Sequence, residues 1–314
     1  MATVVQYERL GGPEVLEVVE VPDPSAPAGG VVVRVRAAGV NPIDGKLRSG
    51  GRPSGPFTGP RVPGSDAAGT VVEVGDGVDD WAVGDEVVVR GARGGYASHL
   101  VADAAQLVRK PAGVTWEQAA AIGIPVSTAH QALRSLGLAD GETLLVHGGS
   151  GAVGRAAVQF ARRTGARVVA TGSPAAHDRL RELGAIPVAY GDGLLERLRE
   201  AAPQGYDRIL DAVGSDEALE TSFALVDDRS RIGTVVVGGR AADLGIQAWA
   251  GGNPVPLTAE QTALREEAYP LALDLIARRE FEVDIARTFP LAEAAEAARL
   301  VESGHPGGKV ILLP

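Results

Sequence analysis

The feature that most constrains this chain is a glycine-rich segment placed between an apolar run and an alanine-rich helical pattern. Gly149, Gly151 and Gly154 form a G-x-G-x-x-G pattern, which a chain with 42 glycines can also produce by chance. Here the pattern follows the apolar residues 144–147 and precedes a helical pattern at 152–164. In that context the first glycine permits a tight turn, the second lets the backbone approach a pyrophosphate, and the third lets helix and strand pack closely. An ordinary strand–turn–helix connection is the alternative, but the context favours a dinucleotide-binding loop that consists of Gly149, Ser150, Gly151, Ala152, Val153 and Gly154.

From residue 143 onward, strand-like and helix-like segments alternate along the chain. Such alternation predicts a parallel sheet covered by helices on both faces and joined by right-handed crossovers. Strands are predicted at 143–147, 167–171, 186–190, 208–211 and 232–237, with helices at 152–164, 175–183, 194–201 and 217–225. After Gly239 we expect a loop with little periodicity to about residue 257, and then helices at 259–277 and 291–302 before a last strand at 309–313.

The first part of the chain has a different pattern, in which short apolar runs are broken by Gly and Pro. Runs at 15–21, 31–40, 69–74 and 86–90 predict a compact, mostly antiparallel β domain. Helical signals begin after this part, at 119–122 and 127–136. The final segment reads as a return to the first domain, so we expect a β-rich domain at 1–115, a dinucleotide-binding domain at 116–250, and a return to the first domain at 251–314.

Composition excludes several classes of protein. The 314 residues suggest two domains, and the net charge of −10 argues against a phosphate backbone as partner. Without cysteine the chain can form neither a disulfide nor a thiolate metal site. No run approaches the ~20 apolar residues that span a bilayer. The first residues also lack the basic start and apolar core of a signal peptide. We therefore expect a cytoplasmic protein with no membrane and no nucleic acid as partner.

The histidines give no sign of a metal site either. They show no metal-ligand spacing, and each is interpreted as a surface or packing residue: His99, His130, His147, His177 and His305. The sequence therefore predicts no bound metal.

The residues after the second predicted strand of the parallel sheet bear on the choice of cofactor. An Asp or Glu there would bind the ribose 2′-hydroxyl of NAD and repel a 2′-phosphate. This chain instead has Ser173, with no carboxylate until Asp178, and with His177 and Arg179 close behind. Arg179 is either a ligand of the phosphate or a solvated helix residue. Because no acid enforces NAD, we predict NADPH, with NADH as the alternative.

Several sequence blocks, in order along the chain, resemble the medium-chain dehydrogenase/reductase superfamily, in its zinc-free quinone oxidoreductase branch. The blocks lie at 38–50, 63–71, 75–78, 83–87, 94–97, 149–161 and 303–310. The resemblance implies a GroES-like β domain, a Rossmann domain and a cleft between them. Zinc alcohol dehydrogenases of this superfamily have Cys where Asn41 stands and a His-Glu pair where Ser65-Asp66 stands, so the resemblance implies no zinc.

The resemblance also implies which residues border the reaction. Lys46 matches a lysine of related enone reductases and is the first candidate for electrophile or proton donor, with a solvated lysine as the alternative. Asn41 resembles an Asn near nicotinamide and substrate, or it forms an Asx-turn before Pro42. Tyr96 is a weaker candidate that could simply pack the β domain. Trp249 lines the acceptor pocket or is buried at a subunit contact. The cofactor should further contact Ser173, Arg179, Tyr190, Thr128, Val213, Gly214, Gly238 and Gly239.

The leading hypothesis is an NADPH-dependent, zinc-independent reductase of quinones or α,β-unsaturated carbonyls. Hydride arriving at carbon moves charge to a remote oxygen, which a few hydrogen-bond donors can stabilise without a metal. One alternative is an enoyl-thioester reductase of lipid or polyketide assembly. Another is a non-catalytic NADPH-binding regulatory protein. Relatives form dimers, and a strand edge near 231–237 could pair across a homodimer.

Overall fold

The computed structural model describes residues 1–304 and 306–314, so His305 lies outside the described residues. The chain forms two compact units, one made of Met1–Ile124 with Tyr269–Pro314 and the other of Pro125–Ala268. Both changes of unit come later in the chain than the expected boundaries after residues 115 and 250. The first is later because α2 (Trp116–Ala121) packs against strands β3, β4 and β15 of the first unit. The second falls inside the long helix α9 (Ala259–Ala277).

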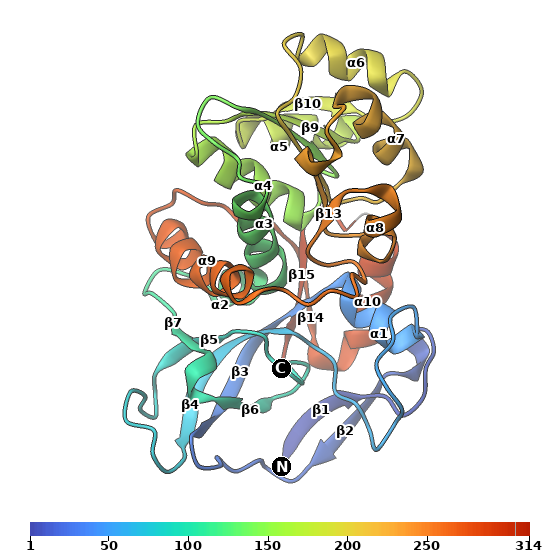
Figure 1. Cartoon of the computed structure of the whole chain (residues 1–314). Helices are drawn as coiled ribbons and strands as arrows, with labels where there is room; N and C mark the ends of the chain where they lie inside the picture. The colour runs from blue at the N-terminus through green and yellow to red at the C-terminus, as the bar shows by residue number, and fades with distance from the viewer. Residues whose placement is uncertain (305) are drawn as a thin grey trace. The chain divides into compact units, whose positions relative to one another are not determined.

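The first unit is built on a mostly antiparallel sheet (Figure 1). Its strand order is β14-β15-β3-β4-β5-β7, with β6 also paired to β3 and only β14 and β15 running parallel. The strands are β3 (Gly30–Val40), β4 (Asp66–Val74), β5 (Glu86–Val89), β6 (His99–Asp103), β7 (Leu107–Arg109), β14 (Ile285–Pro290) and β15 (Lys309–Leu313). A separate antiparallel ribbon joins β1 (Ala2–Gln6) and β2 (Glu17–Val21).

The helices of this unit are short and lie beside the sheet. They are α1 (Pro42–Ser49), α2, α10 (Ala294–Glu302) and the 3-10 turns η1 (Pro13–Val15), η2 (Ala104–Gln106) and η6 (Leu291–Glu293). The core is rich in valine from alternate strand positions, and Phe289 and Leu291 close it from the C-terminal segment. The last strand thus completes a sheet that begins with β3. This pairing joins the two ends of the chain in one unit.

The second unit is a doubly wound parallel sheet, with strand order β10-β9-β8-β11-β12-β13. Its strands are β8 (Thr143–His147), β9 (Arg167–Gly172), β10 (Ile186–Ala189), β11 (Arg208–Asp211), β12 (Ile232–Thr234) and β13 (Gln247–Ala248). Its helices and 3-10 turns are α3 (Gly123–Ser135), which starts in the first unit, α4 (Ala152–Arg163), α5 (His177–Glu182), α6 (Leu194–Ala201), α7 (Asp216–Leu225), α8 (Ala241–Leu244), the first part of α9, η3 (Pro174–Ala176), η4 (Arg229–Arg231) and η5 (Gly238–Arg240).

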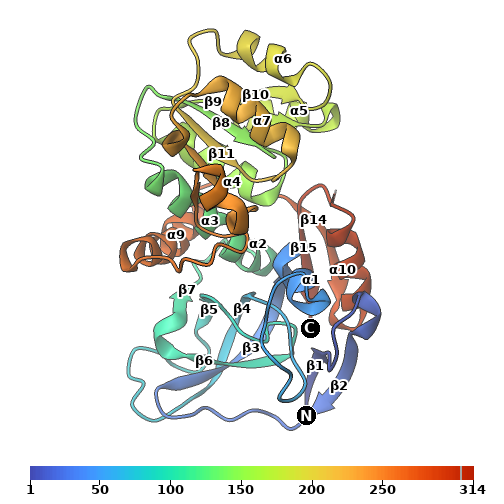
Figure 2. The same ribbon diagram turned by 45° about the vertical axis from the view of Figure 1, so that its right-hand side comes forward.

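Helices α4 and α7 lie on opposite sides of this sheet (Figures 1 and 2). This order is that of a Rossmann sheet, in which ligands bind outside the carboxyl ends of the strands where the order reverses. The strand order reverses between β8 and β11. From β8 the chain continues outward to β9 and β10, and from β11 it continues outward in the other direction to β12 and β13. The expected α/β class, a β-rich unit plus a Rossmann sheet, is confirmed.

The segment after β11 differs from the sequence-based expectation. The predicted strand at 232–237 ends at Thr234, because the hydroxyl of Thr234 accepts the backbone N–H groups of Val236 and Val237 and turns the chain away. The expected loop to residue 257 contains η5, α8 and β13. Since β13 covers β12, the segment 231–237 is not a sheet edge for a dimer; the outer strand on this side is β13.

Candidate active site

The glycine turn follows β8 and opens α4 in the second unit. A Cβ atom at Gly154 would lie 2.2 Å from the carbonyl oxygen of Gly148, and one at Gly149 would lie 2.6 Å from the Cβ of Ala170. Both positions therefore exclude any side chain, because strand and helix pack too closely there. A Cβ at Gly151 would meet nothing nearer than 3.5 Å, so that glycine leaves open space beside the backbone.

Hydrogen bonds to β9 hold one side of the glycine turn, while the first-turn N–H groups of α4 have no side-chain cap. The backbone N–H groups of Gly148 and Gly149 donate to the hydroxyl and carbonyl oxygens of Thr171 in β9, at 3.0 and 2.8 Å. Gly151 is the N-cap of α4 and supplies no side chain to cap the first-turn N–H groups. A helix N-terminus with uncapped amides and open space beside it suits an anion.

The loop after β11 lies next to this turn because β11 pairs with β8. Asp211 is fully buried at the end of β11, where one carboxylate oxygen accepts the N–H groups of Val213 and Gly214 and the other accepts the hydroxyl of Thr234. The side chain of Val213 is 48 % exposed, and that of Tyr190, after β10, is 51 % exposed. The expected cofactor positions Val213, Gly214 and Tyr190 thus follow carboxyl ends of the same parallel sheet, the first two after β11 and Tyr190 after the outer strand β10.

His147, the last residue of β8, is buried beneath the turn, and its Nε2 has no hydrogen-bond partner among the described residues. Burial lowers the pKa of His147 to about 4, although the nearby Asp211 carboxylate raises it in part. This imidazole is therefore neutral at physiological pH. His147 is therefore interpreted as an uncharged packing residue next to the glycine turn.

The end of β9 carries the residues expected to discriminate NADPH from NADH. Ser173 is the N-cap of η3, and its side chain makes no capping hydrogen bond. Asp178 is exposed and pairs with Arg181 at 2.6 Å, and Arg179 pairs with Glu182 at 3.0 Å. No acidic residue stands between β9 and Asp178 in the sequence. Arg179 is thus already bound within its own helix.

The remaining expected residues of the second unit are mostly buried. Thr128 lies on α3 and Gly238 begins η5, and both are buried, whereas Gly239 is more exposed. Trp249 is 5 % exposed, and its ring lies so close to Gly233 that a Cβ there would be 2.4 Å from it. Trp249 therefore packs against the sheet of its own unit, and its expected place at the acceptor pocket or at a subunit contact stays a prediction.

In the first unit, a buried polar cluster joins three distant parts of the chain. Asn41 donates from its amide nitrogen to Asp66 at 2.9 Å and to the Gly39 carbonyl at 3.3 Å, and its amide oxygen accepts the ammonium of Lys309. Lys309 also donates to Asp66 at 2.9 Å. The other oxygen of Asp66 accepts the N–H of Ile124 at 2.8 Å. Both amide hydrogens and the oxygen of Asn41 are used inside the unit, so the geometry gives Asn41 a positioning role, and its expected contact with substrate stays a prediction.

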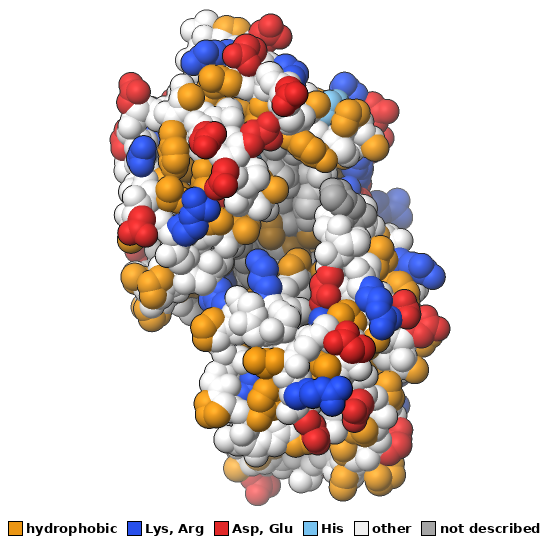
Figure 3. All heavy atoms as spheres, turned by 90° about the vertical axis from the view of Figure 1, so that its right-hand side faces the viewer, with side chains coloured by type: hydrophobic (Ala, Val, Ile, Leu, Met, Phe, Trp, Pro, Cys, Tyr) orange, Lys and Arg blue, Asp and Glu red, His pale blue; other side chains and the backbone are white. Residues whose placement is uncertain are grey.

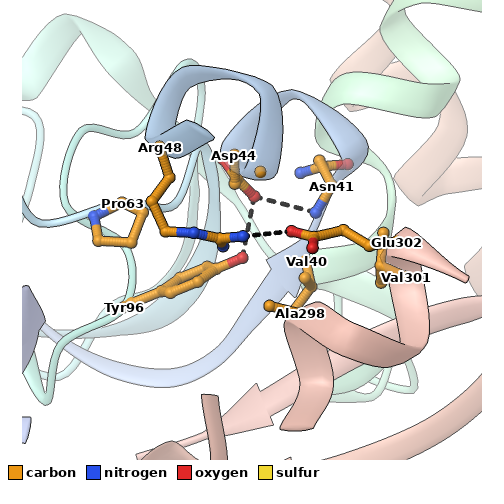
Figure 4. A pocket seen from close by; sticks show the side chains of 10 residues that line it. Val40, Asn41, Asp44, Arg48, Pro63, Tyr96, Ala298, Val301 and Glu302 are labelled. Carbon is orange, nitrogen blue, oxygen red and sulfur yellow. Dashed lines mark hydrogen bonds and ion pairs between the residues drawn. The ribbon is translucent and has the colours of Figure 1, made fainter. Parts of the chain in front are cut away.

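A second part of this cluster surrounds Asp44 on α1 (Figure 4). One oxygen of Asp44 accepts the backbone N–H of Asn41 and the hydroxyl of Tyr96, each at 2.9 Å. Burial raises the pKa of Asp44 to about 6, against the lowering effect of those hydrogen bonds. Burial likewise raises the pKa of the Tyr96 hydroxyl, with Asp44 adding to the effect. Tyr96 is therefore a buried neutral donor to Asp44, and the weaker candidate role at the substrate does not fit its burial.

Arg48 and Glu302 point toward one another and both line a cavity of about 10 Å³, large enough for roughly one water molecule (Figure 4). Their N···O distance is 2.5 Å, and Arg48 is buried. The pair fastens α1 to α10, which stabilises the helix that carries Lys46.

Lys46 lies on the exposed side of α1. Among the described residues its ammonium has no hydrogen bond and no ion pair, unlike Lys309 in the buried cluster and Lys110, which pairs with Glu86 at 2.8 Å. Of the expected catalytic residues, Lys46 is thus the one whose functional group stays available to a ligand.

The sequence analysis missed Lys309, Asp44, Arg48 and Glu302. One signal was available, because Lys309 opens an otherwise apolar strand, Lys309–Leu313, where an unpaired charge would be costly. Its partners could not be identified, since Asn41 and Asp66 are more than 240 residues away.

Within the described part of the chain, no group of three or more His, Cys, Asp or Glu side chains is placed to hold a metal ion. The described helices also include none that is long and apolar enough to cross a membrane. On the face drawn in Figure 3, basic and acidic side chains are interspersed.

Comparison with known proteins agrees with this architecture. The family model of the alcohol dehydrogenase GroES-like domain matches residues 27–112, and that of zinc-binding dehydrogenases matches residues 183–312. Human quinone oxidoreductase is 31 % identical over 329 residues, which cover 98 % of this chain and 97 % of the human protein. Quinone oxidoreductase 1 of Escherichia coli is 32 % identical over the full length of both chains.

Three further proteins are similar to this chain, two of them solved structures and one a much larger enzyme. The structure of Escherichia coli quinone oxidoreductase complexed with NADPH has a TM-score of 0.84 at 27 % identity and covers 99 % of this chain and 100 % of that chain. A mycobacterial protein complexed with NADPH has a TM-score of 0.83 at 30 % identity and covers both chains fully. Polyketide synthase GfsB of Streptomyces halstedii is 48 % identical over 157 residues, which are 50 % of this chain but only 3 % of the synthase.

The chain therefore belongs to the medium-chain dehydrogenase/reductase superfamily. Within it, the full-length similarity assigns the chain to the quinone oxidoreductase branch, and it is an oxidoreductase of that family.

Proposed function

We propose that this protein is an NADPH-dependent, zinc-independent reductase that passes hydride to a quinone or an α,β-unsaturated carbonyl. The proposal depends mainly on the glycine turn at the carboxyl end of β8. Gly149 and Gly154 have no space for a side chain there, and the N-terminus of α4 has no side-chain cap. The NADPH complexes of two full-length relatives support the same assignment.

The residues of the second unit fit a dinucleotide. Gly149 to Gly154 would hold the pyrophosphate through backbone N–H groups, and the exposed side chains of Tyr190 and Val213 offer apolar contact after the carboxyl ends of β10 and β11. Thr128, Gly214, Gly238 and Gly239 complete the proposed contact set. When bound, the cofactor supplies the hydride.

The choice of NADPH over NADH rests on the end of β9. Ser173 presents a hydroxyl where an acid would repel a 2′-phosphate, and Arg179 lies on the following helix. Arg179 already pairs with Glu182, so a phosphate would have to share or replace that partner. We propose that Ser173 together with Arg179 admits the phosphate.

Lys46 is the proposed donor to the acceptor oxygen. Reduction of an enone adds one hydride at carbon and one proton at the other end of the conjugated system, so the oxygen passes through a negatively charged stage. An exposed ammonium without a protein partner can stabilise that charge and hold the proton. Asn41 and Tyr96 are proposed to position Lys46 indirectly, because both donate to Asp44 and thereby fix the N-terminus of α1.

The buried cluster of Asn41, Asp66 and Lys309 supports a reaction without a metal. Asn41 and Asp66 stand at positions where zinc-dependent members of the superfamily have ligands, and in this chain both are bonded to the ammonium of Lys309. A fixed cation beside these groups disfavours a second one. We expect turnover to be unchanged after dialysis against a chelator.

The test mixes the purified protein with NADPH or NADH and, separately, an aromatic quinone and an alkenone, while the loss of reduced nicotinamide is followed. Turnover with NADPH is expected for at least one acceptor, and Lys46→Met should lower kcat more than Lys46→Arg, which keeps the charge. Full activity of Lys46→Met would remove Lys46 from the mechanism. Binding of NADPH without turnover of any acceptor would favour the non-catalytic regulatory alternative.

The 48 % identity to part of a polyketide synthase favours a second candidate, an enoyl-thioester reductase. The two candidates share fold and cofactor and differ in the acceptor. Crotonyl-pantetheine provides the discriminating substrate. A kcat/KM for this thioester well above that for quinones and alkenones would select the second candidate.

We further propose a homodimer that pairs through β13, the outer strand of the parallel sheet. Analytical ultracentrifugation of the wild type and of a variant with Ala248→Pro, which removes a strand N–H, tests this. An unchanged dimer in the variant, or a monomeric wild type, contradicts the proposal.

A further inference from the structure

A second cavity lies wholly in the first unit and is far larger than the one between Arg48 and Glu302. Its volume is about 340 Å³, near the lower end of the range for small-molecule pockets. Its polar lining comes from Tyr7, Asp44, Ser54, Arg61, Ser65 and Arg93. The cavity thus brings two guanidinium groups and several hydroxyl groups to one place.

Arg61 is held in position entirely by neutral groups. It donates to the hydroxyl of Ser54 at 2.5 Å and to the carbonyl oxygens of Gly55 and Pro56 at 2.9 and 2.7 Å, and its guanidinium lies 4.0 Å from the ring centre of Phe57. Its backbone pairs in both directions with that of Tyr7. The charge is therefore fixed at the cavity but not neutralised.

Arg93 is exposed in a glycine-rich turn at 91–95 and has no acidic partner among the described residues. Other arginines of the unit do have one, such as Arg48 with Glu302 and Arg109 with Asp85. Arg61 and Arg93 thus line one cavity in a chain with a net charge of −10, and neither has a carboxylate partner among the described residues. A guanidinium group without a carboxylate partner in the protein matches a carboxylate or a phosphate of a ligand.

The single acidic side chain of the lining, Asp44, does not cancel these charges. It is buried, and one of its oxygens already accepts two hydrogen bonds, from Asn41 and Tyr96. The hydroxyl of Tyr7 has no hydrogen bond among the described residues and lies in the lining as a further donor. The accessible part of the cavity is thus rich in donors and positive in charge.

We propose that this cavity binds the anionic group of a small acceptor, so that the enzyme prefers quinones or enones that carry a carboxylate or a comparable anionic oxygen group. The inference rests on the proposed reductase function. Arg61 supplies a fixed guanidinium, Arg93 a mobile one, and Tyr7 a neutral donor. Small neutral acceptors would lack these contacts.

The experiment compares two enones that share the same conjugated system, the anion 3-benzoylacrylate and its neutral methyl ester, with NADPH as donor. The wild type should show a kcat/KM for the acid about tenfold above that for the ester, which corresponds to roughly 1.4 kcal/mol. Arg93→Met should remove most of this preference through KM and leave the ester within about twofold of wild type. Arg36→Met, which removes an exposed charge outside the cavity, is the matched control and should keep the preference.

A binding measurement separates this inference from the proposed function. Calorimetric titration of the saturated product analogue 3-benzoylpropionate into wild type, Arg93→Met, Arg61→Met and the control Arg36→Met needs no turnover. Weaker binding to both variants than to wild type and Arg36→Met supports the site. Equal binding to all four proteins, or equal loss of kcat/KM for acid and ester in Arg93→Met, overturns it. Absence of turnover with either enone would count against the reductase function alone.

Discussion

The two units of this chain build their polar sites in opposite ways. In the Rossmann unit the proposed site consists of backbone: glycines without space for a side chain and N–H groups at a helix end, all within about ten residues. In the β-rich unit the site depends on side chains, since Asn41, Asp66 and Lys309 meet from three distant segments. A site made of backbone groups depends on residues close together in the sequence, whereas a side-chain network depends on strands that bring distant residues into contact. The following predictions test this difference.

The largest effect is expected from Lys309→Met in the side-chain network. Removal of the ammonium leaves the buried Asp66 carboxylate without its partner, which should lower the free energy of unfolding by about 3–5 kcal/mol. Urea-induced unfolding measures the loss. The double variant Lys309→Met with Asp66→Asn should recover part of it, because no buried charge remains. Arg278→Met breaks an exposed pair and should cost at most about 1 kcal/mol. A loss below that value in Lys309→Met would contradict a network held by buried charge.

Two alanine variants in the turn test whether the backbone site is purely steric. Gly154→Ala forces a methyl group against the Gly148 carbonyl and should weaken NADPH binding by about 100-fold, or roughly 2.7 kcal/mol, with a lower thermal unfolding temperature. Gly151→Ala has room for its methyl group and should keep the unfolding temperature, while the methyl group hinders the pyrophosphate. Fluorescence titration and thermal unfolding separate the two effects. If both variants lost stability equally, the distinct roles of the two glycines would be refuted.

The two units should respond to acid in opposite directions. The pKa of Asp44 is raised from 3.8 to about 6 in the folded chain, so stability gained by its protonation is present at pH 4 and lost as pH rises through 6. The pKa of His147 is lowered from 6.5 to about 4, so stability is present above pH 6.5 and lost as pH falls through 4. Each effect is of the order of 3 kcal/mol at 1.36 kcal/mol per pKa unit.

Amide hydrogen exchange between pH 4 and 7 measures these responses strand by strand, after correction for the intrinsic exchange rate. Relative to Asp44→Asn, the wild-type β-rich unit should become less protected as pH rises. Relative to His147→Asn, the wild-type strand β8 should become more protected. Parallel responses in both units would show that other titrating groups dominate.

The smallest effect is expected from Ser173→Asp at the end of β9. The added carboxylate should weaken NADPH binding about tenfold, or roughly 1.4 kcal/mol, and leave NADH binding unchanged or improved. Ser173→Asn, similar in shape but neutral, is the control and should retain the preference of the wild type. A variant Ser173→Asp that still binds NADPH as tightly as the wild type would place the 2′-phosphate elsewhere.

The sequence alone determined the class of fold, the parallel sheet and the glycine turn. Strands β8, β11 and β15 and helices α6 and α9 have the predicted bounds, because runs of apolar or helix-forming residues and their limits are local signals. The strand at 232–237 was predicted too long, since the hydroxyl of Thr234 ends it through contacts that periodicity does not record. The family was predicted from several short sequence blocks, and the full-length similarity to quinone oxidoreductases confirmed it.

Only the tertiary structure decided which polar side chains remain available. Asn41, Lys46 and Tyr96 were all candidates from the sequence, with Lys46 first and Tyr96 weaker; the fold satisfies Asn41 and Tyr96 internally and leaves Lys46 exposed. It also brought Lys309 to Asn41 and Asp66 and placed Arg61 and Arg93 at one cavity. The physical reason is that burial and hydrogen-bond partners are set by strands far apart in the chain, whereas a helix start or a glycine turn is set by its neighbours.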